Sequence, residues 1–163
     1  MNTFTVVVVS WNARDLTVAC LRSLSEQTYP AQLVCVDNNS EDGSADAIAA
    51  EFPQVSLIRS DRNLGFAGGN NLALRTITTD WVVLLNNDAE VGPDFLANLA
   101  AAAARAAPDV GALTARVLLA GPVDGVVVVN STGNQVRADG YGQDRGWLIP
   151  ADEHHPEPDV FGF

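Results

Sequence analysis

The sequence predicts an α/β fold in which helices flank a mostly parallel sheet. Short, β-branched apolar runs recur up to about residue 117, and segments with helical periodicity separate them. This alternation is typical of parallel strands joined by crossover helices. Three of the apolar runs also end abruptly in polar residues, and the carboxyl ends of parallel strands lie along one edge of a sheet. We therefore expect that edge to carry the function.

The first third of the chain predicts three strands and two helices. The expected strands are at residues 4–9, 33–36 and 55–58, with helices through 16–24 and 45–52 between them. The β-branched composition of the first run favours a central strand. Asn12 is expected to cap the first helix, with Asp15 in the capping-box relation. Ser44 is expected to cap the second helix, which Pro53 ends.

The middle of the chain continues the same alternation. We expect a glycine-rich loop at 61–71, a helix through 72–77, a strand at 81–85, a helix through 95–104 and a strand at 110–117. The strand at 81–85 is short and wholly apolar, which predicts burial on both faces of the sheet. Pro93 suits a first helical position. Glycines in the loop would allow its backbone to approach a ligand or to take positive φ.

The regular pattern ends near residue 119. We interpret residues 1–119 as an α/β domain and 120–163 as an irregular extension of the same domain. Strands are expected at 126–129 and 134–138, as a hairpin through Ser131–Gly133. Residues 140–158 are rich in Gly, Pro and charge, which predicts a mobile loop. The apolar residues 160–163 resemble the first part of a strand, so the fold is expected to be C-terminally incomplete.

Composition excludes several classes of protein. The 163 residues allow one sizeable core. The net charge of −11 argues against binding to nucleic acid or to anionic lipid. No stretch is long enough for a transmembrane helix, and the N-terminus lacks the features of a signal peptide. Cys20 and Cys35 lie among apolar residues and are interpreted as buried thiols, which favours a cytoplasmic protein.

The three polar clusters predict a nucleotide site at the carboxyl edge of the sheet. Trp11 offers an aromatic face to a base, and Asp37 offers an acceptor to a base imide or a ribose hydroxyl. Backbone N–H groups of residues 65–70 would approach phosphate, helped by a helix N-terminus. Asp88 would reach a divalent metal held between phosphates. Structural roles stay open at this stage: packing for Trp11, a tight turn for Gly68 and Gly69, and a turn or cap for Asp88.

Four motifs, in this order, resemble those of the family 2 glycosyltransferases. They comprise residues 6–12 (VVVVSWN), 36–44 (VDNNSEDGS), 63–70 (NLGFAGGN) and 84–88 (LLNND). Within that family the sequence is most similar to the rhamnosyltransferase-like bacterial members. The resemblance implies a GT-A fold and a nucleotide-diphospho-sugar donor such as dTDP-rhamnose or a UDP-sugar. It also implies inverting transfer to a glycan or lipid-linked acceptor in the biosynthesis of a cell-wall or other cell-surface polysaccharide.

The resemblance also implies roles for individual residues. Asp37 would contact the base or ribose, and residues 86–88 stand at the family's Asp-x-Asp position. The first acid is replaced by Asn86, which leaves Asp88 as the contact for a weakly bound, nucleotide-dependent Mg²⁺ or Mn²⁺. The expected nucleotide-binding residues are Ser10, Trp11, Asn12, Asp37, Asn39, Asn63, Gly65, Gly69, Asn70, Asn86, Asn87 and Asp88.

Family members carry the general base in a further C-terminal segment, and no base is identified in this sequence. His154 and His155 are interpreted as solvated. We expect the chain to carry mainly the donor-binding half, to lie in the cytoplasm or at the inner face of the membrane, and to form a homodimer through its C-terminal edge. Two alternatives are a nucleotide-binding module without transferase activity and a sugar-nucleotide nucleotidyltransferase. The second is less favoured, because those enzymes usually have a glycine-rich loop with a basic residue after the first strand, and residues 10–14 (SWNAR) occupy that place here.

Overall fold

The computed structural model describes residues 2–154. The chain forms two compact units, Met1–Ala106 and Ala107–Phe163. The division falls before the boundary expected at residue 119, and the assignment of the later residues to the same functional domain stays a prediction. No helix among the described residues is long and apolar enough to cross a membrane.

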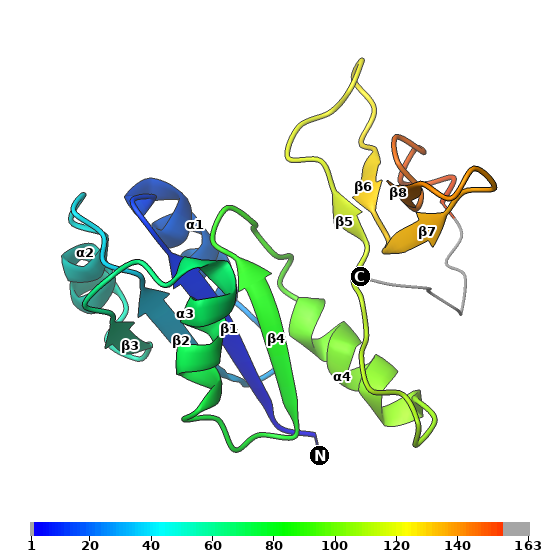
Figure 1. Ribbon diagram of the computed structural model, residues 1–163. Coiled ribbons are helices and arrows are strands. Elements are labelled where there is room, and N and C mark those ends of the chain that lie inside the picture. The colour runs from blue at the N-terminus through cyan, green and yellow to red at the C-terminus, as the bar shows by residue number, and fades with distance from the viewer. Residues whose placement is uncertain (1, 155–163) are drawn as a thin grey trace. The chain divides into compact units, whose positions relative to one another are not determined.

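Unit 1 is built on a four-stranded parallel sheet (Figure 1). Its strand order is β3-β2-β1-β4. The strands are β1 (Phe4–Ser10), β2 (Gln32–Asp37), β3 (Ser56–Arg59) and β4 (Trp81–Asn86). The expected parallel arrangement and the central position of β1 are both confirmed.

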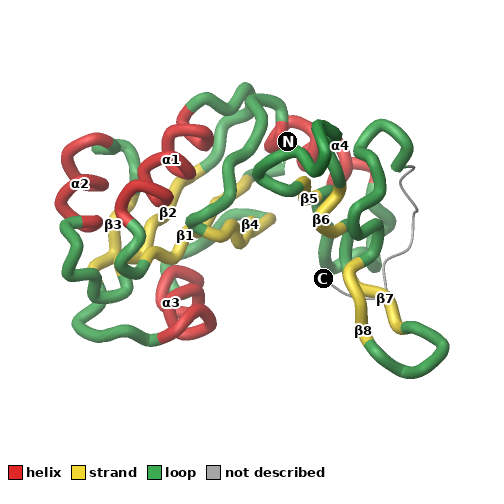
Figure 2. Tube along the Cα trace, turned by 90° about the horizontal axis from the view of Figure 1, so that it is seen from above, coloured by secondary structure: helices red, strands yellow, loops and turns green. Residues whose placement is uncertain are grey.

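Helices cover both faces of this sheet. They are α1 (Arg14–Ser25), α2 (Ser44–Glu51), α3 (Gly65–Leu74) and α4 (Phe95–Arg105). Helices α1 and α2 lie on one face and α3 lies on the other (Figure 2). The predicted fold class, a mostly parallel sheet flanked by helices, is therefore confirmed.

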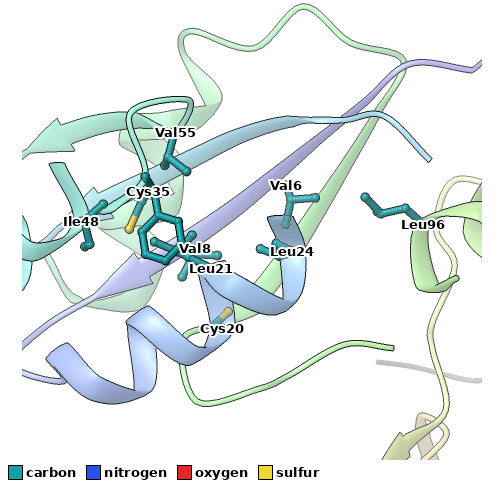
Figure 3. Close-up of a cluster of buried hydrophobic side chains, with 10 residues drawn as sticks. Val6, Val8, Cys20, Leu21, Leu24, Cys35, Ile48, Val55 and Leu96 are labelled. Carbon is teal, nitrogen blue, oxygen red and sulfur yellow. The ribbon is translucent and has the colours of Figure 1, made fainter. Parts of the chain in front are cut away.

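The core of unit 1 lies on the two faces of β1, because successive side chains of a strand point to opposite faces. Val6 and Val8 pack with helix α1, α2 and α4 residues in the larger cluster, whose residues Figure 3 shows converging between sheet and helices. Val7 packs in the smaller cluster with Ala73 of α3. Every one of these β1 side chains is at most 1% exposed, which explains why the run is uniformly apolar.

Both cysteines are free and buried in the larger cluster, as predicted. Burial raises the pKa of the Cys20 thiol to about 12, and the nearby acids Asp88 and Glu90 add to the shift. Burial likewise raises the pKa of Cys35 to about 12. Both side chains are therefore neutral at physiological pH and pack as small apolar groups.

The prediction that Asn12 caps α1 is wrong. The N-cap position is Ala13, which makes no side-chain capping bond. Asn12 instead has a φ of 48°, and its Oδ1 accepts a hydrogen bond of 2.8 Å from the Glu41 N–H. The first N–H of α1, that of Arg14, donates to Oδ2 of Asp42 at 3.0 Å. The cap thus comes from a loop distant in sequence, which a local capping pattern does not reveal.

The glycine-rich stretch is largely helical and not the expected loop. Helix α3 already begins at Gly65, so Gly68 and Gly69 lie inside it. A Cβ added to Gly69 would lie 2.7 Å from Cγ1 of Val9, closer than real Cβ atoms approach. Gly69 therefore allows α3 to pack closely on β1, at the helix-propensity cost that glycine carries.

Strand β4 is less buried than predicted. It pairs with β1 on one side and is the edge strand of the described sheet. Leu84 is 51% exposed, and the other residues of β4 are at least partly exposed. An apolar run predicts a strand but does not distinguish an edge position from a central one. The expectation of burial on both faces is wrong for this unit.

Unit 2 contains two two-stranded antiparallel sheets. Strand β5 (Val117–Leu118) pairs with β6 (Val129–Ser131), and β7 (Asn134–Val136) pairs with β8 (Gly142–Asp144). The strand expected at 110–117 is absent except for Val117. The predicted hairpin through Ser131–Gly133 is also wrong, because its two strands pair with other partners. Strand β8 lies in the stretch expected to be a mobile loop, while residues 160–163 and the dimer contact predicted there lie outside the described residues.

Candidate functional site

The polar ends of three strands meet at one edge of the unit 1 sheet. Ser10, the last residue of β1, is in register with Asp37 of β2, and Val9 is in register with Asn86 of β4. The Asn38 N–H extends the ladder by donating to the Ser10 carbonyl at 2.8 Å. The predicted convergence of the polar clusters is thus present in the structure.

Asp37 is the buried acid of this edge. It is only 4% exposed. Its Oδ2 accepts a hydrogen bond of 3.2 Å from the Ser40 N–H, whereas its Oδ1 is buried and has no partner within the described part of the chain. Burying an unpaired carboxylate oxygen is costly. An unpaired acceptor at the carboxyl edge of a sheet is well suited to accept a hydrogen bond from a ligand.

Asn38 fastens the start of α3 to the end of β2. Its Oδ1 accepts from the Leu64 N–H at 2.9 Å, and its Nδ2 donates to Oδ1 of Asn63 at 2.9 Å and to the Gly65 carbonyl at 3.2 Å. Oδ1 of Asn63 also accepts from the Gly65 N–H at 2.8 Å. The two asparagines therefore fix the N-terminus of α3 beside Asp37.

Sequence reasoning missed Asn38, although Asn63 and Gly65 were expected at the site. Its neighbours Asp37 and Asn39 were selected because they follow a strand, and the same criterion applies to Asn38. The signal that singles it out is tertiary: it is 2% exposed, and its partners lie about 25 residues away in sequence.

The N-terminus of α3 is accessible at its first residues. Gly65 has a φ of 70°, is exposed, and has open space where a Cβ would stand. Asn70, by contrast, is 4% exposed and donates from Nδ2 to the Phe66 carbonyl at 3.0 Å. Asn70 and Gly69 thus stabilise α3 in this structure, and direct ligand contacts by them stay a prediction.

The loop after β1 interlocks with the loop after β2. The Asn12 N–H donates to Oγ of Ser40 at 3.0 Å. In the opposite direction, the Glu41 N–H donates to Oδ1 of Asn12, so two hydrogen bonds join the loops. Asn39 is exposed and has a φ of 67°, a conformation that asparagine tolerates better than most residues. Trp11 is 54% exposed, so it does not serve as a core residue within the described chain and its ring is available to a ligand.

A buried hydroxyl joins β1, α1 and the end of β4. Oγ1 of Thr17 donates to the Ala13 carbonyl at 2.9 Å, lies 2.8 Å from Oγ of Ser10, and accepts from Nδ2 of Asn87 at 3.1 Å. One donated and two accepted bonds use the full capacity of a hydroxyl. Thr17 therefore fixes the side chains of Ser10 and Asn87, both of which were expected at the site. Thr17 itself was not predicted from the sequence.

Asp88 follows β4 at the same edge and is exposed. Sγ of Cys20 donates to the Asn86 carbonyl at 3.6 Å, which anchors the end of β4 to α1. No group of three or more acidic, His or Cys side chains suited to a metal occurs within residues 2–154. A single carboxylate fits a metal whose remaining ligands are phosphate oxygens and water.

A protein-family model described as "Glycosyl transferase family 2" matches residues 5–118. This chain belongs to glycosyltransferase family 2. Except for Phe4, the first residue of β1, the match covers the four strands of the parallel sheet, and it includes every residue of the edge described above.

Curated relatives act in the synthesis of bacterial glycans, according to their names. The chain is 34% identical over 94 residues to the succinoglycan biosynthesis protein ExoO of Rhizobium meliloti. The aligned region covers 56% of this chain and 27% of ExoO. It is 31% identical over 120 residues to the N-acetylglucosaminyl-diphospho-decaprenol L-rhamnosyltransferase of Mycobacterium tuberculosis, covering 66% of this chain and 39% of that enzyme. The chain thus spans well under half the length of these relatives.

A solved structure of similar fold is the mannosyltransferase PcManGT from Pyrobaculum calidifontis in complex with GDP-Man and Mn²⁺. The TM-score is 0.64 at 33% sequence identity, and the match covers 71% of this chain and 36% of that one. The Staphylococcus aureus protein TarS matches with a TM-score of 0.56 at 24% identity, which bears on the fold alone. The predicted GT-A fold is confirmed.

Proposed function

We propose that this chain binds a nucleotide-diphospho-sugar at the carboxyl ends of β1, β2 and β4 and forms the donor half of an inverting glycosyltransferase. The observation that carries the proposal is the buried, unpaired Oδ1 of Asp37, beside the exposed Trp11 ring and the N-terminus of α3. The family match and the GDP-Man named in the PcManGT structure support a donor of this class.

Each part of the edge suits one part of such a donor. Asp37 would accept from a base imide or ribose hydroxyl, and Trp11 would stack on the base. The accessible turn at Gly65 and the N-terminus of α3 would face the diphosphate, because a helix N-terminus favours negative charge. Asn12, Asn39, Asn63 and Asn86 would complete the polar lining. A metal bound at Asp88 would supply positive charge to the leaving diphosphate.

The proposed reaction is a single displacement. The acceptor oxygen forms a bond to the anomeric carbon as the bond from that carbon to the diphosphate oxygen breaks, and a carboxylate base takes the acceptor proton. We assign no base within this chain. The names of the relatives support a cell-surface polysaccharide or a lipid-linked acceptor, and the two buried thiols suit synthesis on the cytoplasmic side of the membrane.

Calorimetric titration with UDP, dTDP and GDP tests the proposal. We expect at least one nucleotide to bind, and Asp37→Ala to weaken that binding by about 1–3 kcal/mol, the usual cost of losing a buried polar contact. Glu51→Ala is the matched control, because Glu51 is an acid at the far end of α2. Equal affinity of wild type and Asp37→Ala would remove Asp37 from the site, and no binding by the whole panel would overturn the proposal.

The same titration with and without Mn²⁺ tests the metal. We expect Mn²⁺ to tighten nucleotide binding to the wild type, because phosphate oxygens complete the coordination that one carboxylate begins. Asp88→Asn should abolish this enhancement and leave metal-free affinity and the circular dichroism spectrum unchanged. An affinity unaffected by excess EDTA would show that Asp88 holds no metal.

A further inference from the structure

Unit 2 contains a cavity of about 510 Å³ that belongs to no part of the donor edge. It is lined by Gln135, Gln143, Asp144, Gly146, Trp147 and Ile149. Its volume lies in the range of small-molecule sites, roughly 300–1,000 Å³. All six of these residues belong to unit 2.

Two amide side chains stand together in this cavity. Gln135 of β7 is directly opposite Gln143 of β8 in the antiparallel register, which places both side chains on the same face of the pair. Neither side chain makes a hydrogen bond within residues 2–154. Each amide has donors and an acceptor to offer a ligand.

A fixed turn presents Trp147 to the same cavity. The Ile149 N–H donates to the Gly146 carbonyl at 3.0 Å, and Leu148 has a φ of 61°, which leucine rarely adopts. Two further bonds of 2.9 Å, from the Leu148 N–H to the Val129 carbonyl and from the Val129 N–H to the Ile149 carbonyl, tie the turn to β6. The 52% exposed Trp147 ring is thus carried by a well-anchored backbone.

The charge of the lining indicates which ligands the cavity suits. Among the described lining residues, Asp144 is the charged one, and none is Lys, Arg or His. A phosphate or other anion would find no cationic partner there. A neutral molecule with an apolar face and several hydroxyl groups matches an indole ring beside two amides and a carboxylate, and a pyranose ring has this character.

We propose that this cavity binds a neutral pyranose unit. The identity of that unit as part of the acceptor glycan, and not the sugar of the donor, rests on the proposed function. The Trp147 ring stacks on the C–H face of the sugar, and the amides of Gln135 and Gln143 pair with its hydroxyl groups. The preformed turn lowers the entropic cost of binding.

Nuclear magnetic resonance of the ¹⁵N-labelled chain tests this site directly. The protein has three tryptophans, and Trp147→Phe assigns the indole signal of Trp147. The probes are methyl glycosides of rhamnose, glucose, galactose, mannose and N-acetylglucosamine, together with UDP and UDP-glucose. We expect at least one methyl glycoside to shift the Trp147 signal saturably and to leave the Trp11 signal unchanged, whereas UDP shifts that of Trp11.

Variants separate the cavity from its surroundings. Trp147→Ala and the double variant Gln135→Ala/Gln143→Ala should weaken glycoside binding at least tenfold, about 1.4 kcal/mol, with UDP affinity unchanged. Tyr141→Ala is the matched control, because Tyr141 is a 74% exposed aromatic residue near β8 that does not line the cavity.

The outcomes distinguish this inference from the proposed function. Nucleotide binding without any saturable glycoside shift at Trp147 would overturn the sugar cavity and leave the donor site standing. Glycoside binding without nucleotide binding would support the cavity and overturn the donor site. Stronger binding at Trp147 by UDP-glucose than by every methyl glycoside would show that the cavity takes the donor and not the acceptor.

Discussion

The two units of this chain keep their shape by different means. In unit 1, four parallel strands and four helices enclose the apolar clusters, and side chains such as Leu21 and Ile48 are fully buried. In unit 2, the buried apolar side chains of the described residues are Val128 and Val129, and many others, including Trp147 and Tyr141, are exposed. Isolated two-stranded sheets are marginally stable in water. We therefore expect unit 1 to contribute most of the folding free energy.

The two units also differ in how firmly each fixes the residues of its binding site. The polar residues at the edge of unit 1 stand on buried strands, which fix their positions. The cavity of unit 2 stands on short strands and turns, which depend on local hydrogen bonds. We expect the donor site to persist under conditions that disorder unit 2.

The largest expected effect comes from the core of unit 1. Leu21→Ala removes a side chain that is 0% exposed, so it should lower the free energy of unfolding by about 2–5 kcal/mol. Leu16→Ala, on the same helix but 54% exposed, should change it by under about 0.5 kcal/mol. Urea denaturation followed by circular dichroism measures both. Equal losses in the two variants would contradict the assignment of the core to this face of α1.

The same contrast explains what could be predicted from the sequence. Strands β1, β2 and β4 of unit 1 were predictable because each contains a run of at least four apolar residues, which is long enough to indicate a strand. The strands of unit 2 have two or three residues each. The pairing of β7 with β8 runs through a turn at 137–141, in which the Arg137 N–H donates to the Tyr141 carbonyl at 2.8 Å. A pattern of hydrophobicity carries little information about such short pairs.

The site was predictable in part for a related reason. Asp37 and Asn86 directly follow the strands expected at 33–36 and 81–85, so the sequence places them at the carboxyl edge, and they are the last residues of β2 and β4. Thr17 and Asn38 act through partners about 70 and 25 residues away, which only the folded chain brings together. Gly69 was misinterpreted as a loop residue because its reason, close contact with Val9, is also tertiary.

The next effect tests the connection between the core and the edge of unit 1. Thr17→Val keeps the shape of the side chain but removes the hydroxyl that joins Ser10 to Asn87. It should lower the free energy of unfolding by about 1–3 kcal/mol, because the buried Ser10 hydroxyl and the partly buried Asn87 amide lose a partner. Thr17→Ser retains the hydroxyl and is the matched control. A Thr17→Val protein as stable as wild type, with unchanged nucleotide affinity, would show that this hydroxyl does not organise the edge.

The smallest expected effect concerns Asp42, whose carboxylate serves two helices of unit 1. It accepts from the Arg14 N–H at the start of α1 and from the N–H of Ser44 at the start of α2. The hydrogen bond from the Ser44 hydroxyl is the main cause that lowers the pKa of Asp42. Desolvation opposes it, and the backbone bond from Arg14 adds to it. Asp42 is exposed, so we expect Asp42→Ala to cost only about 0.5–1 kcal/mol at pH 7.

The pH dependence of this cost has a definite sign. Because folding lowers the pKa of Asp42, its contribution is present above the unfolded pKa, near 3.9, and is lost as the pH falls through the folded value. The difference in unfolding free energy between wild type and Asp42→Ala should therefore narrow below about pH 4. Asp61→Ala, at an exposed acid with no side-chain partner among the described residues, is the matched control. A difference that stays constant from pH 7 to the acid limit would mean that the carboxylate does not cap these helices.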